Sequence, residues 1–266
     1  MKAHEIQLDH LPEKSLFISD IHLEREPGSE KDTACEQDAI LLLQQAASKG
    51  YTIFLLGDIF DYWMEIKGRI PPVAPTFLAS IQKLVSDQSI YMVTGNHDNW
   101  TEGYFMQMGV KECQDLISTK NGSILAHGDG FKDLKWGLKR PLKHRLLRNR
   151  WFIKLFQTLF SPERCWRLMQ DFSKDSYHKS QGKASEEAIL DTWVEKQMQL
   201  HQRPLIICGH DHVGRMKEFE CGVYINSGFF YKDRTFVIRN GTRLALCRFE
   251  HTEWIPLQQT SISFEP

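Results

Sequence analysis

The amino-acid sequence predicts a mixed α/β sandwich, and three features support that prediction. Short runs rich in β-branched and aromatic residues recur along the chain, helical patterns separate the first of them, and the later runs follow one another closely. Strands that alternate with helices form a parallel sheet, whereas closely spaced strands form an antiparallel portion. At 266 residues the chain can bury a substantial core, so residues 1–266 are expected to form a single domain.

The elements follow in order along the chain. After the first strand, Thr33 and Glu36 have capping-box spacing, and an apolar run leads to Gly50, which suits the residue that follows a helix. A second helix is expected over 74–87, and Ser161 with Pro162 marks the start of a later helix. The predicted strands are 15–19, 51–56, 89–94, 123–126, 204–208, 222–226 and 234–238.

Residues 130–203 interrupt this pattern of strands. They are helical in composition and contain no strand signal. We therefore expect a helical insertion at about 130–203, between two strands of the sheet.

Composition argues against several classes of protein. The formal net charge is −1, so nothing global marks a nucleic-acid-binding protein, and no nucleic-acid partner is expected. The six cysteines are scattered without a CxxC pair, which indicates a reducing compartment. No stretch approaches the roughly 18 apolar residues of a membrane span, and the N-terminus lacks the apolar region of a signal peptide. A cytoplasmic protein is therefore expected.

Polar residues able to bind metal follow five of the predicted strands, at the point where each strand ends. One such group alone is ordinary turn chemistry. Five groups that reuse Asp, Asn and His favour a shared site, because open parallel sheets bind ligands at the carboxyl ends of their strands. The groups are Asp20-Ile21-His22, Gly57-Asp58-Ile59-Phe60-Asp61, Gly95-Asn96-His97-Asp98, His127-Gly128-Asp129 and Gly209-His210-Asp211-His212.

The mixture of imidazole and carboxylate groups predicts a metal centre. Such ligands suit Mn, Fe, Zn or Ni, whereas Mg and Ca prefer sites made of oxygen alone. Seven side chains are too many for one ion, but two ions that share a carboxylate and a water would use them all, as in sites that clamp phosphoryl groups. We expect two divalent transition-metal ions, with Mn favoured. The candidate ligands are Asp20, His22, Asp58, Asn96, His127, His210 and His212.

In this order, the five groups resemble the signature of the calcineurin-like metallophosphoesterase superfamily. The pattern Asp-x-His, Gly-Asp-x-x-Asp, Gly-Asn-His-Asp, His-Gly-Asp, Gly-His-x-His spans residues 20–212 and is specific as a set. The resemblance implies a four-layer α/β/β/α sandwich with the helical insertion as a lid. It also implies that Asp58 bridges two metals, one held by Asp20, His22, Asp58 and His212 and the other by Asp58, Asn96, His127 and His210.

A closer resemblance comes from the segment GDIFDYW at 57–63, the chain length and the position of the insertion. These features are similar to the lipid A pathway diphosphatases, which act on UDP-2,3-diacylglucosamine. The resemblance implies a dinuclear-metal hydrolase that produces UMP and 2,3-diacylglucosamine 1-phosphate by attack of a metal-activated water.

Further roles follow for residues beside the ligands. His97 would protonate the leaving oxygen, and Asp98 would orient His97. His97 and Asn96 are expected to contact the substrate. Asp61 and Asp129 would orient ligand histidines or turns.

The insertion combines positive charge with large apolar side chains. Between Lys132 and Lys154, nine basic residues stand against one acid, Asp133. Packing beneath a helical cap would explain the apolar residues. We favour instead a surface that binds an anionic membrane and an acylated diphosphate, because the basic and apolar residues directly follow the candidate metal ligand His127 in the sequence. The expected partners are thus a nucleotide-linked glycolipid substrate and the inner face of the cytoplasmic membrane, on which the protein would be peripheral. The residues predicted to share one helix face are Phe152, Phe156, Leu159 and Phe160.

Two other functions remain open at this point. A phosphodiesterase or nucleotide phosphatase with a soluble substrate would use the same metal site, but it gives no reason for so much apolar surface beside it. An inactive relative could serve as a scaffold for other proteins, but it would have no chemical need for all seven ligands. Fold alone does not separate these functions.

Overall fold

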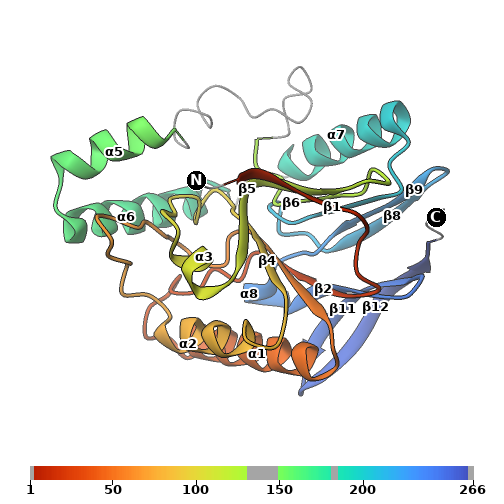
Figure 1. Cartoon of the computed structure of the whole chain (residues 1–266), viewed down its shortest axis with the longest axis horizontal. Coiled ribbons are helices and arrows are strands. Elements are labelled where there is room, and N and C mark those ends of the chain that lie inside the picture. The colour runs from red at the N-terminus through yellow and green to blue at the C-terminus, as the bar shows by residue number, and fades with distance from the viewer. Residues whose placement is uncertain (1–2, 131–148, 181–184, 263–266) are drawn as a thin grey trace.

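A mixed 12-stranded β-sheet forms the centre of the protein, with helices on its outer faces (Figure 1). The structure, a computed structural model, describes residues 3–130, 149–180 and 185–262. The strands are β1 (Ala3–Leu8), β2 (Lys14–Ile18), β3 (Thr52–Leu56), β4 (Ile90–Val93), β5 (Lys111–Thr119), β6 (Ile124–Ala126), β7 (Leu205–Cys208), β8 (Arg215–Phe219), β9 (Gly222–Asn226), β10 (Thr235–Asn240), β11 (Arg243–Glu250) and β12 (Glu253–Ser261). The helices are α1 (Glu30–Ser48), α2 (Pro75–Leu84), α3 (Tyr104–Met108), α5 (Arg150–Leu159), α6 (Pro162–Ser180), α7 (Ser185–His201) and α8 (Phe230–Asp233).

The sheet has two halves that run in opposite directions. Its strand order is β12-β11-β10-β2-β3-β4-β5-β6-β7-β9-β8, with β1 paired to β5. Strands β2 to β5 are parallel, as are β6, β7 and β9, but β5 and β6 are antiparallel. The mixed α/β fold is confirmed. The five strand ends, however, do not lie along the edge of one parallel sheet, because the strand direction reverses at β6.

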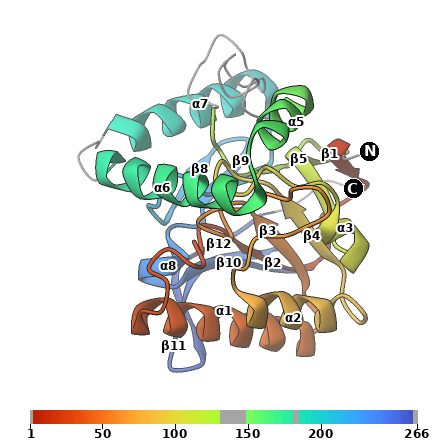
Figure 2. The same ribbon diagram turned by 90° about the vertical axis from the view of Figure 1, so that its left-hand side faces the viewer.

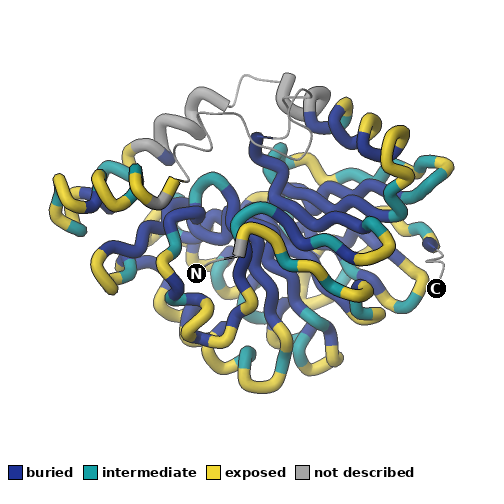
Figure 3. The backbone as a smooth tube through the Cα atoms, turned by 45° about the horizontal axis from the view of Figure 1, so that its top comes forward, coloured by how far each residue is buried: buried dark blue, intermediate teal, exposed yellow. Residues whose placement is uncertain are grey.

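The two halves of the sheet face each other across a shared hydrophobic cluster. Phe17 of β2 and Phe54 of β3 belong to this cluster, as do Leu205 and Ile207 of β7. Alternate residues of the same strands point outward, to α1 and α2 on one side and to α7 on the other. Buried strands therefore lie in the middle of the molecule, between helices (Figures 2 and 3).

Helix α1 begins one turn earlier than the sequence predicted. Ser29, not Thr33, is the N-cap, and its hydroxyl accepts a hydrogen bond of 3.0 Å from the backbone N–H of Asp32. This start places Glu30 and Asp32 in the first turn, where their negative charges stabilise the helix dipole. At the other end, Gly50 follows the helix with a φ of +77°, as predicted.

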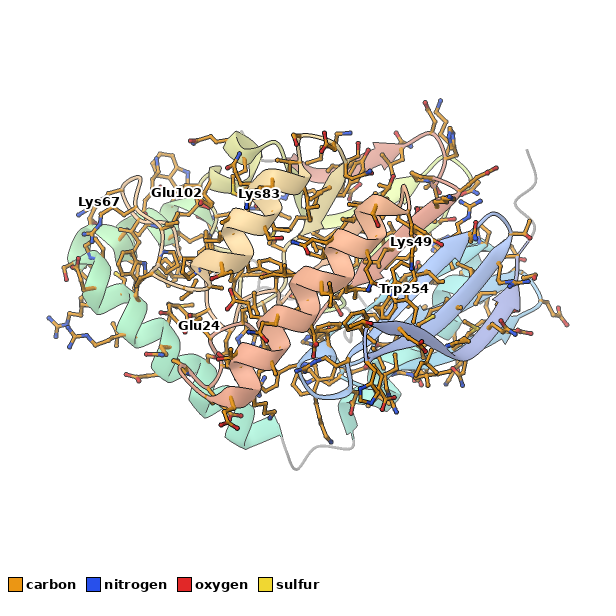
Figure 4. The ribbon with its side chains drawn as sticks, turned by 90° about the horizontal axis from the view of Figure 1, so that it is seen from below. Glu24, Lys49, Lys67, Lys83, Glu102 and Trp254 are labelled. Carbon is orange, nitrogen blue, oxygen red and sulfur yellow. The ribbon has the colours of Figure 1, made fainter. Side chains whose placement is uncertain are left out.

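The C-terminal end of α1 is anchored to the edge of the sheet. Lys49, which caps this end, places its Nζ 3.9 Å from the ring centroid of Trp254 on β12. From below, α1 and α2 lie side by side, and Lys49 lies close to Trp254 (Figure 4).

The described part of the chain between β6 and β7 consists mainly of helices α5, α6 and α7, as predicted, while residues 131–148 and 181–184 lie outside the described residues. This undescribed part, 131–148, contains the basic residues expected between 132 and 148. Helices α5 and α6 pack on the segment that follows β3, where the Gln157 side-chain amide donates to the Glu65 carbonyl at 2.6 Å. Trp166 Nε1 donates to the Met64 carbonyl at 2.9 Å. None of the helices within the described ranges is long and apolar enough to cross a membrane.

The predicted apolar face of α5 is only partly correct. Phe152, Phe156 and Phe160 pack against the core, but Leu159 is 67% exposed. Trp151 and Leu155 are exposed on the same side as Leu159, at 72% and 60%. Helix α5 thus has two apolar stripes, and only one of them is buried.

Candidate metal centre

Loops at the ends of five strands meet through their own backbones. The Asp20 N–H donates to the Gly57 carbonyl at 3.1 Å, and the Gly209 N–H donates to the His127 carbonyl at 2.9 Å. The approach is close enough that a Cβ atom on Gly95 would lie 2.1 Å from Asp58 Oδ1. Only glycine fits at this position, so Gly95 allows the close backbone approach.

One cluster of potential metal ligands contains Asp20, His22 and His212. Asp20 Oδ1 lies 3.2 Å from His212 Nε2 and 3.9 Å from His22 Nε2. The two imidazole Nε2 atoms are 3.3 Å apart. Phe229 stacks on His212, with ring centroids 4.1 Å apart and an interplanar angle of 5°, and so restricts the orientation of this partly exposed ring.

A second cluster contains Asp58, His127 and His210. Asp58 Oδ2 lies 3.2 Å from His127 Nε2 and 3.9 Å from His22 Nε2 of the first cluster. Asp58 therefore stands between the two clusters, as a bridging carboxylate would. Two such clusters fit a dinuclear metal site.

Buried polar atoms support this interpretation. Among the described residues, Asp20 Oδ1, Asn96 Oδ1 and His127 Nε2 are buried without a hydrogen-bond partner. A buried polar atom without a partner costs free energy, so each of these atoms favours a cation at the centre. All three belong to the seven ligands predicted from the sequence.

The charges around His127 also favour a cation at the centre. Burial lowers the pKa of His127, but Asp58, Asp20 and Asp129 outweigh burial and raise it to about 10. Burial would raise the pKa of Asp58, yet the histidines around it hold that pKa well below its usual range. The carboxylates thus stabilise positive charge at the centre, which a proton or a metal ion can supply.

Two of the histidines are oriented by hydrogen bonds at Nδ1. His22 Nδ1 lies 3.0 Å from Asp61 Oδ1, and His127 Nδ1 lies 2.9 Å from the Leu56 carbonyl. Each partner accepts a hydrogen bond from Nδ1–H, which leaves Nε2 able to bind a metal. Asp61 makes the contact with His22 that its predicted orienting role requires, while the role of Asp129, which is fully buried, stays a prediction.

Five of the candidate ligands have a left-handed backbone, which residues other than glycine rarely adopt. The φ angles are +53° at Asp20, +49° at His22, +51° at Asp58, +77° at His210 and +63° at His212. Such conformations cost on the order of 1–3 kcal/mol each and concentrate at functional sites.

His97 lies beside the metal ligands, but Asp98 does not orient it as predicted. His97 Nδ1 lies 2.7 Å from the Asp61 carbonyl oxygen, and its Nε2 lies 4.0 Å from Asp58 Oδ2. The Asp98 carboxylate instead accepts the backbone N–H groups of Ile59 and Gly95, each at 2.7 Å. Asp98 therefore holds the loops after β3 and β4 together, since two backbone donors already engage its carboxylate.

The sequence reasoning missed several residues that support the ligands. The Ser19 hydroxyl donates to Asp20 Oδ2 and lies 2.6 Å from Ser227 Oγ. Asn226 donates from its side chain to the Gly209 carbonyl at 2.8 Å. Asn226 ends the predicted strand 222–226 and Ser227 follows it, so they were a sixth polar strand end that could have been recognised.

Comparisons with known proteins identify a family and several similar proteins. The Calcineurin-like phosphoesterase family matches residues 14–214. A UDP-2,3-diacylglucosamine hydrolase of Coxiella burnetii is 28% identical over 204 residues, which are 74% of this chain and 80% of that protein. One of Porphyromonas gingivalis is 31% identical over 143 residues, 51% of this chain and 53% of that protein. Among solved structures, a phosphoesterase of E. coli has a TM-score of 0.47 and 15% identity, and the match covers 94% of this chain and 100% of that one.

The family match spans most of the chain and includes all five groups, four of which supply the two clusters. Its members are phosphoesterases, and a His/Asp centre of this kind is the chemistry that such hydrolases use. The chain belongs to the calcineurin-like phosphoesterase family and is a metallophosphoesterase.

Proposed function

We propose that this chain hydrolyses UDP-2,3-diacylglucosamine to UMP and 2,3-diacylglucosamine 1-phosphate, a step of lipid A biosynthesis. The observation that supports hydrolysis of a diphosphate is the buried centre in which Asp58 stands between two His/Asp clusters. The choice of substrate is supported by relatives that carry this substrate in their names at 28% and 31% identity.

The centre would hold two divalent transition-metal ions. Mn²⁺ is our choice, with Fe, Zn or Ni as alternatives, because imidazole, carboxylate and one amide oxygen make up the ligand set. When bound, such ions lower the pKa of water and neutralise charge on phosphate oxygens. We assign Asp20, His22, Asp58 and His212 to one ion, and Asp58, Asn96, His127 and His210 to the other.

His97 is proposed to protonate the leaving oxygen. Its Nδ1 donates to the Asp61 carbonyl at 2.7 Å, so its Nε2 is the nitrogen that faces the ligands. A substrate phosphate between the clusters and His97 would place the leaving oxygen within reach of Nε2. Asn96, the preceding residue, would contact the same phosphate through its side-chain amide.

Contact with the cytoplasmic face of the membrane is proposed for the insertion, which would act as a lid. Trp151, Leu155 and Leu159 recur every fourth residue on the exposed side of α5, and the exposed Lys154 lies beside them. An exposed apolar stripe with a basic neighbour suits the interface of an anionic bilayer. The acyl chains of the proposed substrate are anchored in such a bilayer, so enzyme and substrate would meet at its surface.

Release of UMP tests the proposed reaction. The purified protein with Mn²⁺ and UDP-2,3-diacylglucosamine should release UMP in proportion to enzyme, and the Asp58→Ala variant should release none. If the protein cleaves a simple phosphodiester but releases no UMP, the lipid substrate is wrong and a soluble substrate replaces it. If it cleaves neither while it binds metal, both proposed substrate classes are wrong.

A further inference from the structure

Helix α6 of the insertion reaches the metal centre through Ser173. Ser173 is 6% exposed, and its hydroxyl donates to Asp61 Oδ2. Its oxygen also lies 3.2 Å from His97 Nδ1. Because Asp61 Oδ1 lies 3.0 Å from His22 Nδ1, a continuous chain of contacts joins His97, Ser173, Asp61 and His22.

The direction of each hydrogen bond in this chain follows from the number of protons. A serine hydroxyl has one proton, and Ser173 gives it to Asp61, because an ionised carboxylate only accepts. Between Ser173 and His97, the imidazole must therefore be the donor. His97 Nδ1–H is shared between Ser173 Oγ at 3.2 Å and the Asp61 carbonyl at 2.7 Å. Two acceptors thus hold the proton on Nδ1 and fix the plane of the ring.

Ser173 is held in place by the rest of α6. Trp166, seven residues earlier and so on the same face of the helix, donates to the Met64 carbonyl at 2.9 Å. At the start of the helix, Glu163 forms an ion pair of 2.8 Å with Arg69. Because Met64 and Arg69 follow Asp61 in the chain, these contacts fix α6 to the segment that carries Asp61.

We propose that Ser173 is a positioning residue that aligns His97 for protonation of the leaving group, and that the insertion thereby completes the catalytic centre. This inference depends on the proposed acid role of His97, but not on the identity of the lipid substrate. A competing explanation is that Ser173 only attaches α6 to the core. The two explanations differ in which substrates a substitution should affect.

Two phosphodiesters with different leaving groups provide the test. A 4-nitrophenolate group departs without a proton, whereas an unsubstituted phenolate needs one far more. Ser173→Ala should lower kcat for the phenyl ester by about 10–100-fold, the usual effect of losing an orienting partner, and by less than about 3-fold for the nitrophenyl ester. The protein-bound metal should be unchanged.

Other variants distinguish the loss of His97 alignment from a general destabilisation of the fold. Ser173→Thr retains the hydroxyl and should keep kcat within a few-fold of the wild type. Ser173→Cys conserves volume but hydrogen-bonds weakly, so it should show the same preference for the nitrophenyl ester as Ser173→Ala. Thr158→Ala, which removes a hydroxyl that bonds the Leu155 carbonyl on α5, should leave both rates unchanged.

A double-substitution cycle completes the experiment. If Ser173 acts through His97, then adding Ser173→Ala to His97→Ala should lower kcat by less than about a further 3-fold, because the effects of interacting residues are not additive. Full additivity, or an equal loss with both esters, would overturn the positioning role. If His97→Ala itself slows both esters equally, the acid role of His97 fails, and this inference fails with it.

Discussion

At the scale of single residues, Asp58 has the most consequential position in the centre. Its Oδ2 lies between His127 Nε2 and His22 Nε2, which belong to different clusters. The left-handed backbone at Asp58 and the glycine at position 95 are both needed to bring this carboxylate there. A ligand shared by two ions should be needed by both of them.

Replacing Asp58 by Asn should therefore reduce metal binding at both positions, not at one. We expect the content of Mn²⁺, measured after gel filtration by elemental analysis, to fall from about two ions per chain to well below one. Asp191→Asn is the matched control, because its carboxylate bonds Arg215 and Lys217 and contacts none of the ligands described here. Retention of one tightly held ion in the Asp58 variant would show that the carboxylate is not shared.

The seven candidate ligands could be predicted because each follows a buried strand, and because Asp, Asn and His recur at the ends of those strands. Ser173 could not be found in this way. It is one serine within a helix, and its partners Asp61 and His97 are 112 and 76 residues away in the chain. The role of Asp98 was misjudged for a related reason: proximity in sequence to His97 did not indicate that backbone groups would engage its carboxylate.

At the scale of elements, every strand predicted from the sequence exists, but not every strand was predicted. All seven predicted strands exist, because a strand buried on both faces is a continuous apolar run. Strands β1, β5, β8, β11 and β12 were missed. Most residues of β8 and β12 are exposed or half-buried and show no alternation of apolar and polar residues, whereas β5 and β11 were missed although they are largely buried. For α5, periodicity revealed an apolar face but could not tell which of two stripes would meet the core.

The exposed stripe of α5 should contribute to binding of anionic vesicles. Trp151→Ser combined with Leu155→Ser removes two large apolar side chains, each worth about 1.5 kcal/mol or more at an interface, so the vesicle partition coefficient should fall at least about 100-fold. Co-sedimentation with vesicles that contain phosphatidylglycerol measures this change. Binding should also weaken as salt is raised, if basic residues of the insertion contribute.

Leu200 provides the control for that measurement. It is 63% exposed at the end of α7, so Leu200→Ser removes a similar apolar side chain from another helix. Equal loss of vesicle binding in both variants would argue against a specific role for α5. No binding by the wild type would contradict the peripheral location altogether.

At the scale of the whole molecule, the centre joins the two halves of the sheet. Each cluster takes side chains from both: Asp20 and His22 follow β2, while His212 follows β7, and Asp58 follows β3, while His127 follows β6. The halves also share the hydrophobic cluster between them, but the loops that carry the ligands bring together several negative charges. Metal ions should therefore act as a cross-link between the halves as well as a catalytic device.

Removal of metal should accordingly destabilise the entire domain. A ligand that binds only the folded state at 100 times its dissociation constant stabilises that state by about 2.7 kcal/mol per site. For a chain of this size, such a gain raises Tm by at least about 5 °C. We expect calorimetry to show this difference between the Mn²⁺-loaded protein and protein dialysed against a chelator. The Asp58→Asn variant should show little or no gain with Mn²⁺, because the shared ligand is lost. An equal rise of Tm in that variant would mean that the ions stabilise the protein at some other position than between the two halves of the sheet.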